Sequence, residues 1–117
     1  MENNSTASLL RIFISSTDKY KDGLLYENIV FKAKESGLAG ATVIKSVLGY
    51  GASSVIHSYK FWEITEKLPI VVEIIDENEK ILSFYEQIRP VLETMRYGCL
   101  ATIEDIKIML YKPGPKR

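Results

Sequence analysis

The chain has 117 residues, 46% of them hydrophobic and 26% charged, which is typical of one globular domain rather than a disordered or membrane-spanning chain. Fifteen lysines and arginines balance fifteen acidic residues, so no basic excess supports a dedicated nucleic-acid-binding domain. The single cysteine, Cys99, excludes an internal disulfide, and no cysteine–histidine spacing predicts a metal site.

Both ends of the chain lack the pattern of a folded element. Residues 1–8 are polar, and we expect a disordered tail there. Residues 112–117 carry prolines and a glycine, which predicts a flexible C-terminal tail. The folded domain is therefore expected to span residues 9–111. The acidic start has no basic leader before an apolar run, so we expect a cytoplasmic protein.

A strand and a helix are predicted first. Residues 9–15 are rich in β-branched side chains and predict a strand that ends at a Ser-Ser-Thr-Asp turn. Over residues 24–36, apolar side chains recur every four positions, which indicates an amphipathic helix. We expect Asp22 to cap the start of this helix and Gly37 to end it in the left-handed conformation.

Two further strands follow with a less regular segment between them. Residues 41–47 are rich in β-branched side chains and predict the second strand. Residues 55–64 alternate loosely, which fits either a strand extension or an ordered loop. Pro69 then opens the third strand over residues 70–75, because proline is tolerated at the first position of a strand.

A second helix and a fourth strand complete the domain. Asp76 and Glu79 form an aspartate version of the capping box at the start of the helix. The apolar stripe of this helix is formed by Ile81, Phe84, Tyr85 and Ile88. We expect Pro90 to end or kink the helix near the last of these, with a further turn or two over residues 91–95. Residues 100–111 predict the fourth strand.

This order of strand–helix–strand–strand–helix–strand predicts an α+β, ferredoxin-like fold. Right-handed crossovers then give a four-stranded antiparallel sheet with both helices on one face. Two helices cannot cover the other face, where we expect exposed apolar side chains at Phe13, Val43 or Ile44, Val72 and Ile74. Such a face is usually buried against further copies of the chain, so we expect an oligomer.

Reactive side chains are scarce. His57 is the only histidine, so no second histidine can complete a catalytic pair with it. We expect Cys99 to be a small buried apolar side chain rather than a nucleophile. The sequence contains no Walker loop and no GxGxxG motif. These features predict a protein that is not an enzyme.

Glycines flank the second predicted strand, with Gly37 and Gly40 before it and Gly49 and Gly51 after it. One interpretation is structural, because glycine ends helices and shapes bends. The other is functional: without Cβ atoms, Gly49 and Gly51 would let backbone N–H groups approach a bound anion. Thr42 would then offer its hydroxyl, which is both donor and acceptor, to a flat heteroaromatic group.

The ordered series Gly-Leu-Ala-Gly-Ala-Thr-Val at 37–43, Gly-Tyr-Gly at 49–51 and Leu-Pro-Ile-Val-Val-Glu-Ile at 68–74 resembles the PII signal-transduction proteins. The sequence most resembles the PII-like branch long described as a domain of unknown function. That branch shares the Leu-Arg-Ile-Phe-Ile strand, the turn at 18–21 and the segment 53–58. The resemblance covers nearly the whole predicted domain.

The resemblance implies a homotrimer that binds an adenine nucleotide (AMP, ADP, ATP or cyclic AMP) in clefts between subunits and requires no cofactor. The positions that correspond to nucleotide-binding residues are Thr42, Gly49, Gly51, Ser53, Ser54, Gly98 and Lys112. The Arg-Gln pair of many PII proteins is replaced here by Ala52 and Ser53, and the loop around Gly98 lacks the usual lysine. Fewer fixed charges predict weaker triphosphate binding, with the two serines as neutral donors.

Residues 52–67 contain three aromatic side chains, Tyr59, Phe61 and Trp62. These either pack on the sheet edge or form a partner-docking loop, which is the role that the resemblance implies. The implied partner is a membrane transporter or channel, recognised according to the bound nucleotide. The alternative is a trimer of the same fold that binds a metal or another small ligand, as the related copper-tolerance proteins do, although one histidine and one cysteine supply few ligands.

Overall fold

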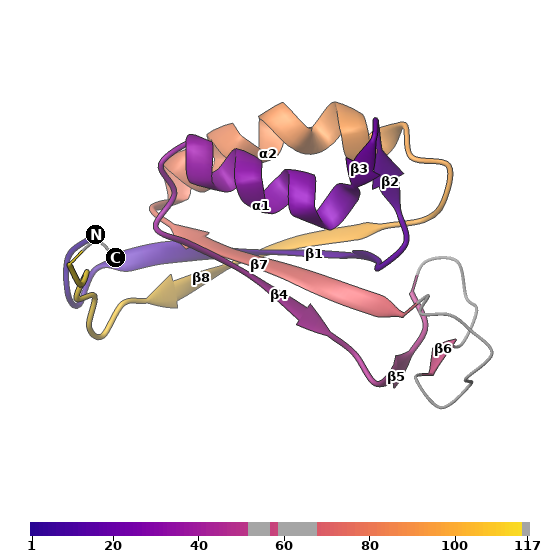
Figure 1. The fold of residues 1–117 in the computed structure, drawn as a ribbon. Coiled ribbons are helices and arrows are strands. Elements are labelled where there is room, and N and C mark those ends of the chain that lie inside the picture. The colour runs from indigo at the N-terminus through magenta and orange to yellow at the C-terminus, as the bar shows by residue number, and fades with distance from the viewer. Residues whose placement is uncertain (52–56, 59–67, 116–117) are drawn as a thin grey trace.

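The computed structural model describes residues 1–51, 57–58 and 68–115, which Figure 1 draws in colour. Its main sheet has four strands, β1 (Thr6–Ser15), β4 (Gly40–Lys45), β7 (Pro69–Asp76) and β8 (Leu100–Lys107). They lie in the order β4-β7-β1-β8, and each neighbouring pair is antiparallel. Helices α1 (Leu25–Glu35) and α2 (Asn78–Glu93) both lie on one face of the sheet (Figure 1). The predicted α+β, ferredoxin-like arrangement is confirmed.

Two short hairpins are attached to this unit. The first pairs β2 (Lys19–Tyr20) with β3 (Gly23–Leu24) between β1 and α1, and it lies in the layer of the helices (Figure 1). The second pairs β5 (Leu48–Gly49) with β6 (His57–Ser58) beyond the end of β4. The segment predicted at 55–64 therefore contains a two-residue strand, and the rest of it lies outside the described residues.

The core lies between the sheet and the two helices. Alternate residues of β1 and β7 point toward the helices, and the register places Ile12 opposite Val72 and Leu10 opposite Ile74. The almost fully buried apolar side chains of this cluster are Leu10, Ile12, Leu25, Ile29, Ala33, Ile70, Val72, Ile74, Ile81, Phe84 and Ile88. Burial of each large member stabilises the fold by about 1.5–3 kcal/mol. One copy of the chain therefore has its own core.

No described helix covers the opposite face of the sheet (Figure 1). Of the side chains expected on that face, Val72 and Ile74 are instead fully buried beneath the helices, and Val43 packs against the same core. The prediction was wrong at Val72 and Ile74 because β7 is apolar at both odd and even positions, so its pattern does not say which side faces the helices. Phe13 and Ile44 do lie on the open face.

An apolar row crosses all four strands of the open face. The register pairs Ile44 with Val71, Val71 with Phe13, and Phe13 with Leu100. Directly paired residues project to the same side of a sheet, so these four side chains are neighbours. The two outer members stay accessible, since Ile44 is 46% exposed and Leu100 52% exposed. A contiguous apolar row of this kind marks an interaction surface.

The ends of β1 and β8 differ from the prediction. β1 starts at Thr6, so residues 6–8 of the expected disordered tail belong to the sheet. The Asn4 N–H donates to the Ile108 carbonyl (2.5 Å), and the Ile108 N–H donates to the Ser5 carbonyl (2.8 Å). These bonds extend the pairing of β1 with β8 into polar sequence, where side-chain patterns carry no signal. β8 ends at Lys107 rather than at residue 111, and residues 112–115 form no helix or strand.

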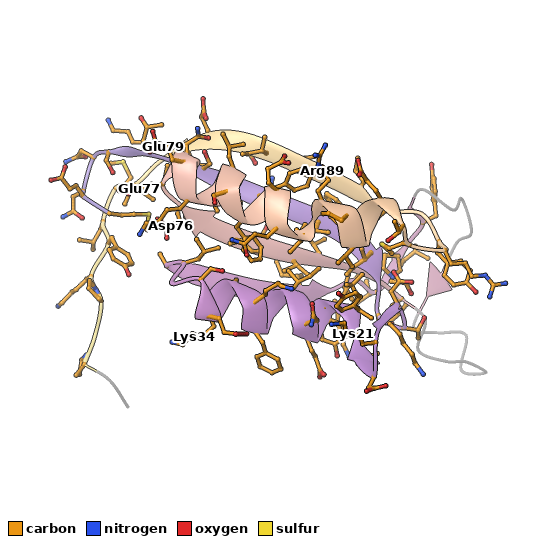
Figure 2. The ribbon with its side chains drawn as sticks, turned by 90° about the horizontal axis from the view of Figure 1, so that it is seen from above. Lys21, Lys34, Asp76, Glu77, Glu79 and Arg89 are labelled. Carbon is orange, nitrogen blue, oxygen red and sulfur yellow. The ribbon has the colours of Figure 1, made fainter. Side chains whose placement is uncertain are left out.

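Neither helix starts with the predicted cap. α1 follows Leu24, which makes no side-chain cap, and Asp22 lies in the turn between β2 and β3. Glu77 occupies the N-cap position of α2, and no capping box forms between Asp76 and Glu79. Figure 2 shows these three acidic residues together where α2 begins. The Asp76 side chain instead accepts a hydrogen bond from the Glu77 N–H at 2.6 Å.

The helix ends confirm one prediction and decide between the alternatives of another. Gly37 follows α1 with a φ of 77°, the left-handed conformation that the sequence predicted. α2 does not end before Pro90 but continues through it to Glu93. Pro90 lacks an N–H, but Leu92 in the next turn is buried in the core, and this burial offsets the lost hydrogen bond. Thr94 then closes the helix, with its N–H donating to the Pro90 carbonyl at 3.1 Å.

Candidate functional site

Two glycines follow β4: Gly49 is half-buried in β5, opposite His57, and Gly51 is exposed. The φ angles of Gly49 and Gly51 lie outside the left-handed region, so neither position needs glycine for its backbone conformation. A Cβ atom at Gly49 would meet Pro69 Cγ at 3.7 Å, an ordinary contact, and one at Gly51 would meet no described atom within 4 Å. Among the described residues, neither glycine is therefore required by its φ angle or by a close neighbour, and both interpretations of the pair remain predictions.

Thr42 lies on β4 itself, exposed and on the open face. It belongs to a polar row beside the apolar one, since Thr42 pairs with Glu73, Glu73 with Arg11, and Arg11 with Thr102. The Thr42 hydroxyl therefore lies at the outer end of a row of polar groups, on the strand at the edge of the sheet.

A charged cluster that was not predicted from the sequence includes two residues of this row, Arg11 and Glu73, and also Glu104 of β8. Arg11 Nε donates to the Glu73 carboxylate at 2.9 Å, and its guanidinium also pairs with Glu104. Glu73 first and Glu104 second raise the pKa of Arg11. The three residues come from three different strands, so only the strand pairing brings them together.

Gly98 and Cys99 lie in the loop from α2 to β8, and Gly98 is exposed. The Cys99 thiol is partly buried, with its Sγ 3.7 Å from the Leu92 carbonyl. Burial, and to a smaller extent the Asp18 carboxylate, raise the pKa of this thiol. A thiol that stays protonated at neutral pH is a poor nucleophile, in line with the expectation for Cys99.

The sheet order separates the candidate residues into two groups. Thr42, Gly49 and Gly51 lie on or just beyond β4, at one edge of the sheet, whereas Gly98 leads into β8, at the other edge. Gly49, in β5, and Gly98, just before β8, are nevertheless at the end of the sheet where β1 finishes (Figure 1), whereas Thr42 pairs with Glu73 in the middle of β7. Because β7 and β1 lie between the two edges, one chain does not bring the two groups together.

Lys112 is the outlier. It follows Tyr111, whose N–H donates to the Asn3 side-chain oxygen at 2.8 Å, and this contact holds it beside the start of β1. Lys112 therefore lies at the opposite end of the sheet from Gly49 and Gly98. The remaining predicted residues, Ser53, Ser54, Tyr59, Phe61 and Trp62, lie outside the described part of the chain.

Across residues 1–51 and 68–115, no group of three or more His, Cys, Asp or Glu side chains is arranged to hold a metal ion. No helix in the described part of the chain is both long enough and apolar enough to cross a membrane. A shallow hollow between α1 and α2 is lined by Leu38 and Phe84 together with the opposite charges of Glu79 and Lys80.

Sequence comparison groups this chain with a known family. The model of the DUF190 family, described as "Uncharacterized ACR", matches residues 7–108. A UPF0166 protein of Aquifex aeolicus (strain VF5) is 40% identical over 101 residues, which cover 86% of this chain and 91% of that protein. A UPF0166 protein of Methanocaldococcus jannaschii is 33% identical over 75 residues, or 64% of this chain and 68% of that protein.

Comparison of structures gives the same fold. CPII of Thiomonas intermedia K12, a nitrogen regulatory PII-like protein solved with ADP, AMP and bicarbonate bound, matches with a TM-score of 0.68. The alignment covers 91% of each chain at 15% identity. At this identity the likeness shows the fold alone, and it is the PII-like fold that the glycine series predicted.

Proposed function

Because the chain belongs to the DUF190 family, we propose that it is a PII-like signalling protein that binds an adenine nucleotide between copies of itself. In this proposal the protein is a sensor and not an enzyme. The nucleotide class is supported by CPII, which has the same fold and was solved with ADP and AMP bound. The position of the nucleotide is supported by the two sheet edges and by the open face of the sheet.

The observation that carries the proposal is the separation of the two groups of candidate residues. Gly49 and Gly51 follow the β4 edge and Gly98 precedes the β8 edge, at the same end of the sheet. If the β4 edge of one copy faces the β8 edge of the next, the two stretches of exposed main chain meet in a cleft. Such head-to-tail contacts form a ring when the rotation between copies closes, and we propose that three copies close it into a trimer.

The open face favours the same assembly. Ile44 and Leu100, the outer members of the apolar row, lie on the two edges that would meet. Their burial would be favourable at roughly 25 cal/mol for each Å² of apolar surface removed from water. Arg11 would enter the interface already paired with two carboxylates, which lowers the cost of burying its charge.

Inside the cleft, the backbone N–H groups around Gly49 and Gly51 would bind phosphate oxygens, and the Thr42 hydroxyl would bind the adenine edge. Few fixed cations accompany these groups, so a nucleotide with one or two phosphates suits the cleft at least as well as ATP. Lys112, at the opposite end of the sheet, is not part of this proposal.

The nucleotide would act on the segment 52–67. Gly49 pairs with His57 across the β5–β6 hairpin, so a ligand at Gly49 is one strand away from this segment. We propose that binding shifts the conformation of the segment and thereby selects a partner, a membrane transporter or channel, through Tyr59, Phe61 and Trp62.

Calorimetry tests the binding step. Titration of the purified protein with ADP should give one site per chain, with GDP binding roughly tenfold or more weakly because its purine edge differs. Trp62 is the only tryptophan, so its fluorescence should change with the same apparent affinity. No heat with AMP, ADP, ATP or cyclic AMP at millimolar concentrations would contradict the proposal.

A further inference from the structure

A second hollow lies within a single copy of the chain. It has a volume of about 260 Å³ and is lined by Thr17, Asp18, Lys19, Met95, Arg96 and Tyr97. Thr17 and Asp18 connect β1 to β2, Lys19 is the first residue of β2, and the other three follow α2. The β2–β3 hairpin and the loop after α2 lie at the same end of the molecule (Figure 1), and the lining residues place the hollow between the start of this hairpin and that loop. The proposed nucleotide cleft, in contrast, needs the β4 edge of another copy.

The side chains of the hollow carry a net positive charge. Lys19 and Arg96 both line it, and neither forms an ion pair with another described residue. The one acid is Asp18, which is 7% exposed and whose carboxylate already accepts the Ser15 N–H at 2.8 Å. An anion in the hollow would thus meet two cations and one carboxylate that is already engaged in a structural hydrogen bond.

The walls of the hollow also suit a compact apolar group. Met95 forms one wall and Tyr97 another, and the Arg96 guanidinium lies 5.2 Å from the centre of the Tyr97 ring. A guanidinium held over a ring keeps its plane oriented while its N–H groups remain available. The C-terminal end of α2 lies nearby, and the free carbonyl groups of a helix C-terminus disfavour an anion. This effect is reduced here, because the Pro90 carbonyl already accepts hydrogen bonds from the N–H and the hydroxyl of Thr94.

From these features we propose that this hollow is a second ligand site, which takes a small metabolite with a phosphate or carboxylate group on a compact apolar body. Lys19 and Arg96 bind the oxyanion, and Met95 and Tyr97 contact the body. The site does not rest on the proposed nucleotide function. Its loop continues directly to Gly98, so occupancy would position that glycine and couple the ligand to the neighbouring cleft.

The test uses phenyl phosphate, inorganic phosphate and benzoate as probes, with the heat of binding as the readout. Phenyl phosphate or benzoate should bind saturably to the unmodified protein, and whichever binds more tightly identifies the oxyanion class. Lys19→Gln and Arg96→Gln should each weaken that binding about tenfold. Lys34→Gln is the matched control, because Figure 2 shows Lys34 at the other end of α1 from the hairpin residue Lys21. The Lys34→Gln variant should bind the probe as tightly as the unmodified protein does.

Two results would overturn this inference. The first is no saturable binding of either aromatic probe, or equal binding by all three variants. The second is competition between the probe and ADP for one site, which would assign the hollow to the nucleotide cleft. Failure of ADP to bind, with probe binding intact and lost in Arg96→Gln, would support the second site and reject only the nucleotide proposal.

Discussion

The Asp76 carboxylate accepts a hydrogen bond from the Ala39 backbone N–H at 2.9 Å, which ties the last residue of β7 to the residue before β4. Its other oxygen accepts the Glu77 N–H at 2.6 Å, at the start of α2. Asp76 is only 3% exposed. One buried carboxylate therefore joins the sheet edge that we assign to the nucleotide cleft with the second helix.

Asp76→Ala should lower the free energy of unfolding by about 2 kcal/mol, because it leaves two backbone N–H groups without their acceptor. Asp76→Asn keeps one acceptor oxygen and should lose about 1 kcal/mol. Urea unfolding at a fixed protein concentration measures both. An Asp76→Ala protein within about 0.5 kcal/mol of the unmodified chain would show that water replaces the carboxylate.

Gly51→Val should weaken ADP binding roughly tenfold or more while leaving the fold unchanged. The φ of Gly51 lies outside the left-handed region and no described atom lies within 4 Å of the added Cβ, so the new side chain displaces none of the described residues and is expected to obstruct the ligand. Calorimetry measures the affinity, and thermal unfolding measures stability. Gly23→Val is the matched control, since its Cβ also meets nothing within 4 Å, and it should bind ADP normally.

Gly37→Val should behave in the opposite way. Its φ of 77° is a conformation that a β-branched residue rarely adopts, so unfolding should become easier by at least about 1 kcal/mol. ADP affinity of the folded protein should remain unchanged. A stable Gly37→Val protein would contradict the assigned end of α1.

Leu100→Glu should dissociate the oligomer. It places a carboxylate in the apolar row that we propose to be buried between copies, where an unpaired charge costs several kcal/mol. Leu82→Glu on α2 is the control, because Leu82 has similar exposure, 47% against 52%, but lies outside that row. Sedimentation velocity should show dissociation for the first variant alone, and equal behaviour of the two would argue against burial of the open face.

Cys99 should react slowly with iodoacetamide at neutral pH in the folded protein and faster after unfolding in urea. Burial raises the thiol pKa in the folded state above its unfolded value. The stability contribution of the neutral thiol is therefore complete below the unfolded pKa and is lost as the pH rises through the folded pKa. The stability difference between unmodified protein and Cys99→Ala should shift against the unmodified protein as the pH rises into the alkaline range.

The order of the strands and helices was predictable because the apolar side chains of most segments recur with the period of a strand or of a helix. Which β7 side chains face the helices was not predictable from the sequence. Val71, Val72 and Ile74 are all apolar, and only the position of the helices distinguishes them. Asp76 matched the local pattern of a cap, yet its hydrogen bond to Ala39 spans the fold and has no local signature.

The candidate site shows the same limit. Thr42, Gly49 and Gly51 could be proposed from one stretch of sequence, because they surround a single strand. The pairing of Arg11 with Glu73 and Glu104, and the meeting of Lys19 with Arg96, depend on contacts between segments far apart in the chain. A site shared between copies is harder still to predict from the sequence. The structure indicates it only indirectly, because the sheet order places the two groups of candidate residues on opposite edges of one chain.

Native mass spectrometry of the purified protein with ADP tests the central proposal most directly. The account predicts an assembly of three 13.3-kDa chains, about 40 kDa, that retains up to one ADP per chain and loses the nucleotide when it dissociates. A folded 13.3-kDa monomer as the dominant species, with no nucleotide retained by any assembly, would contradict it.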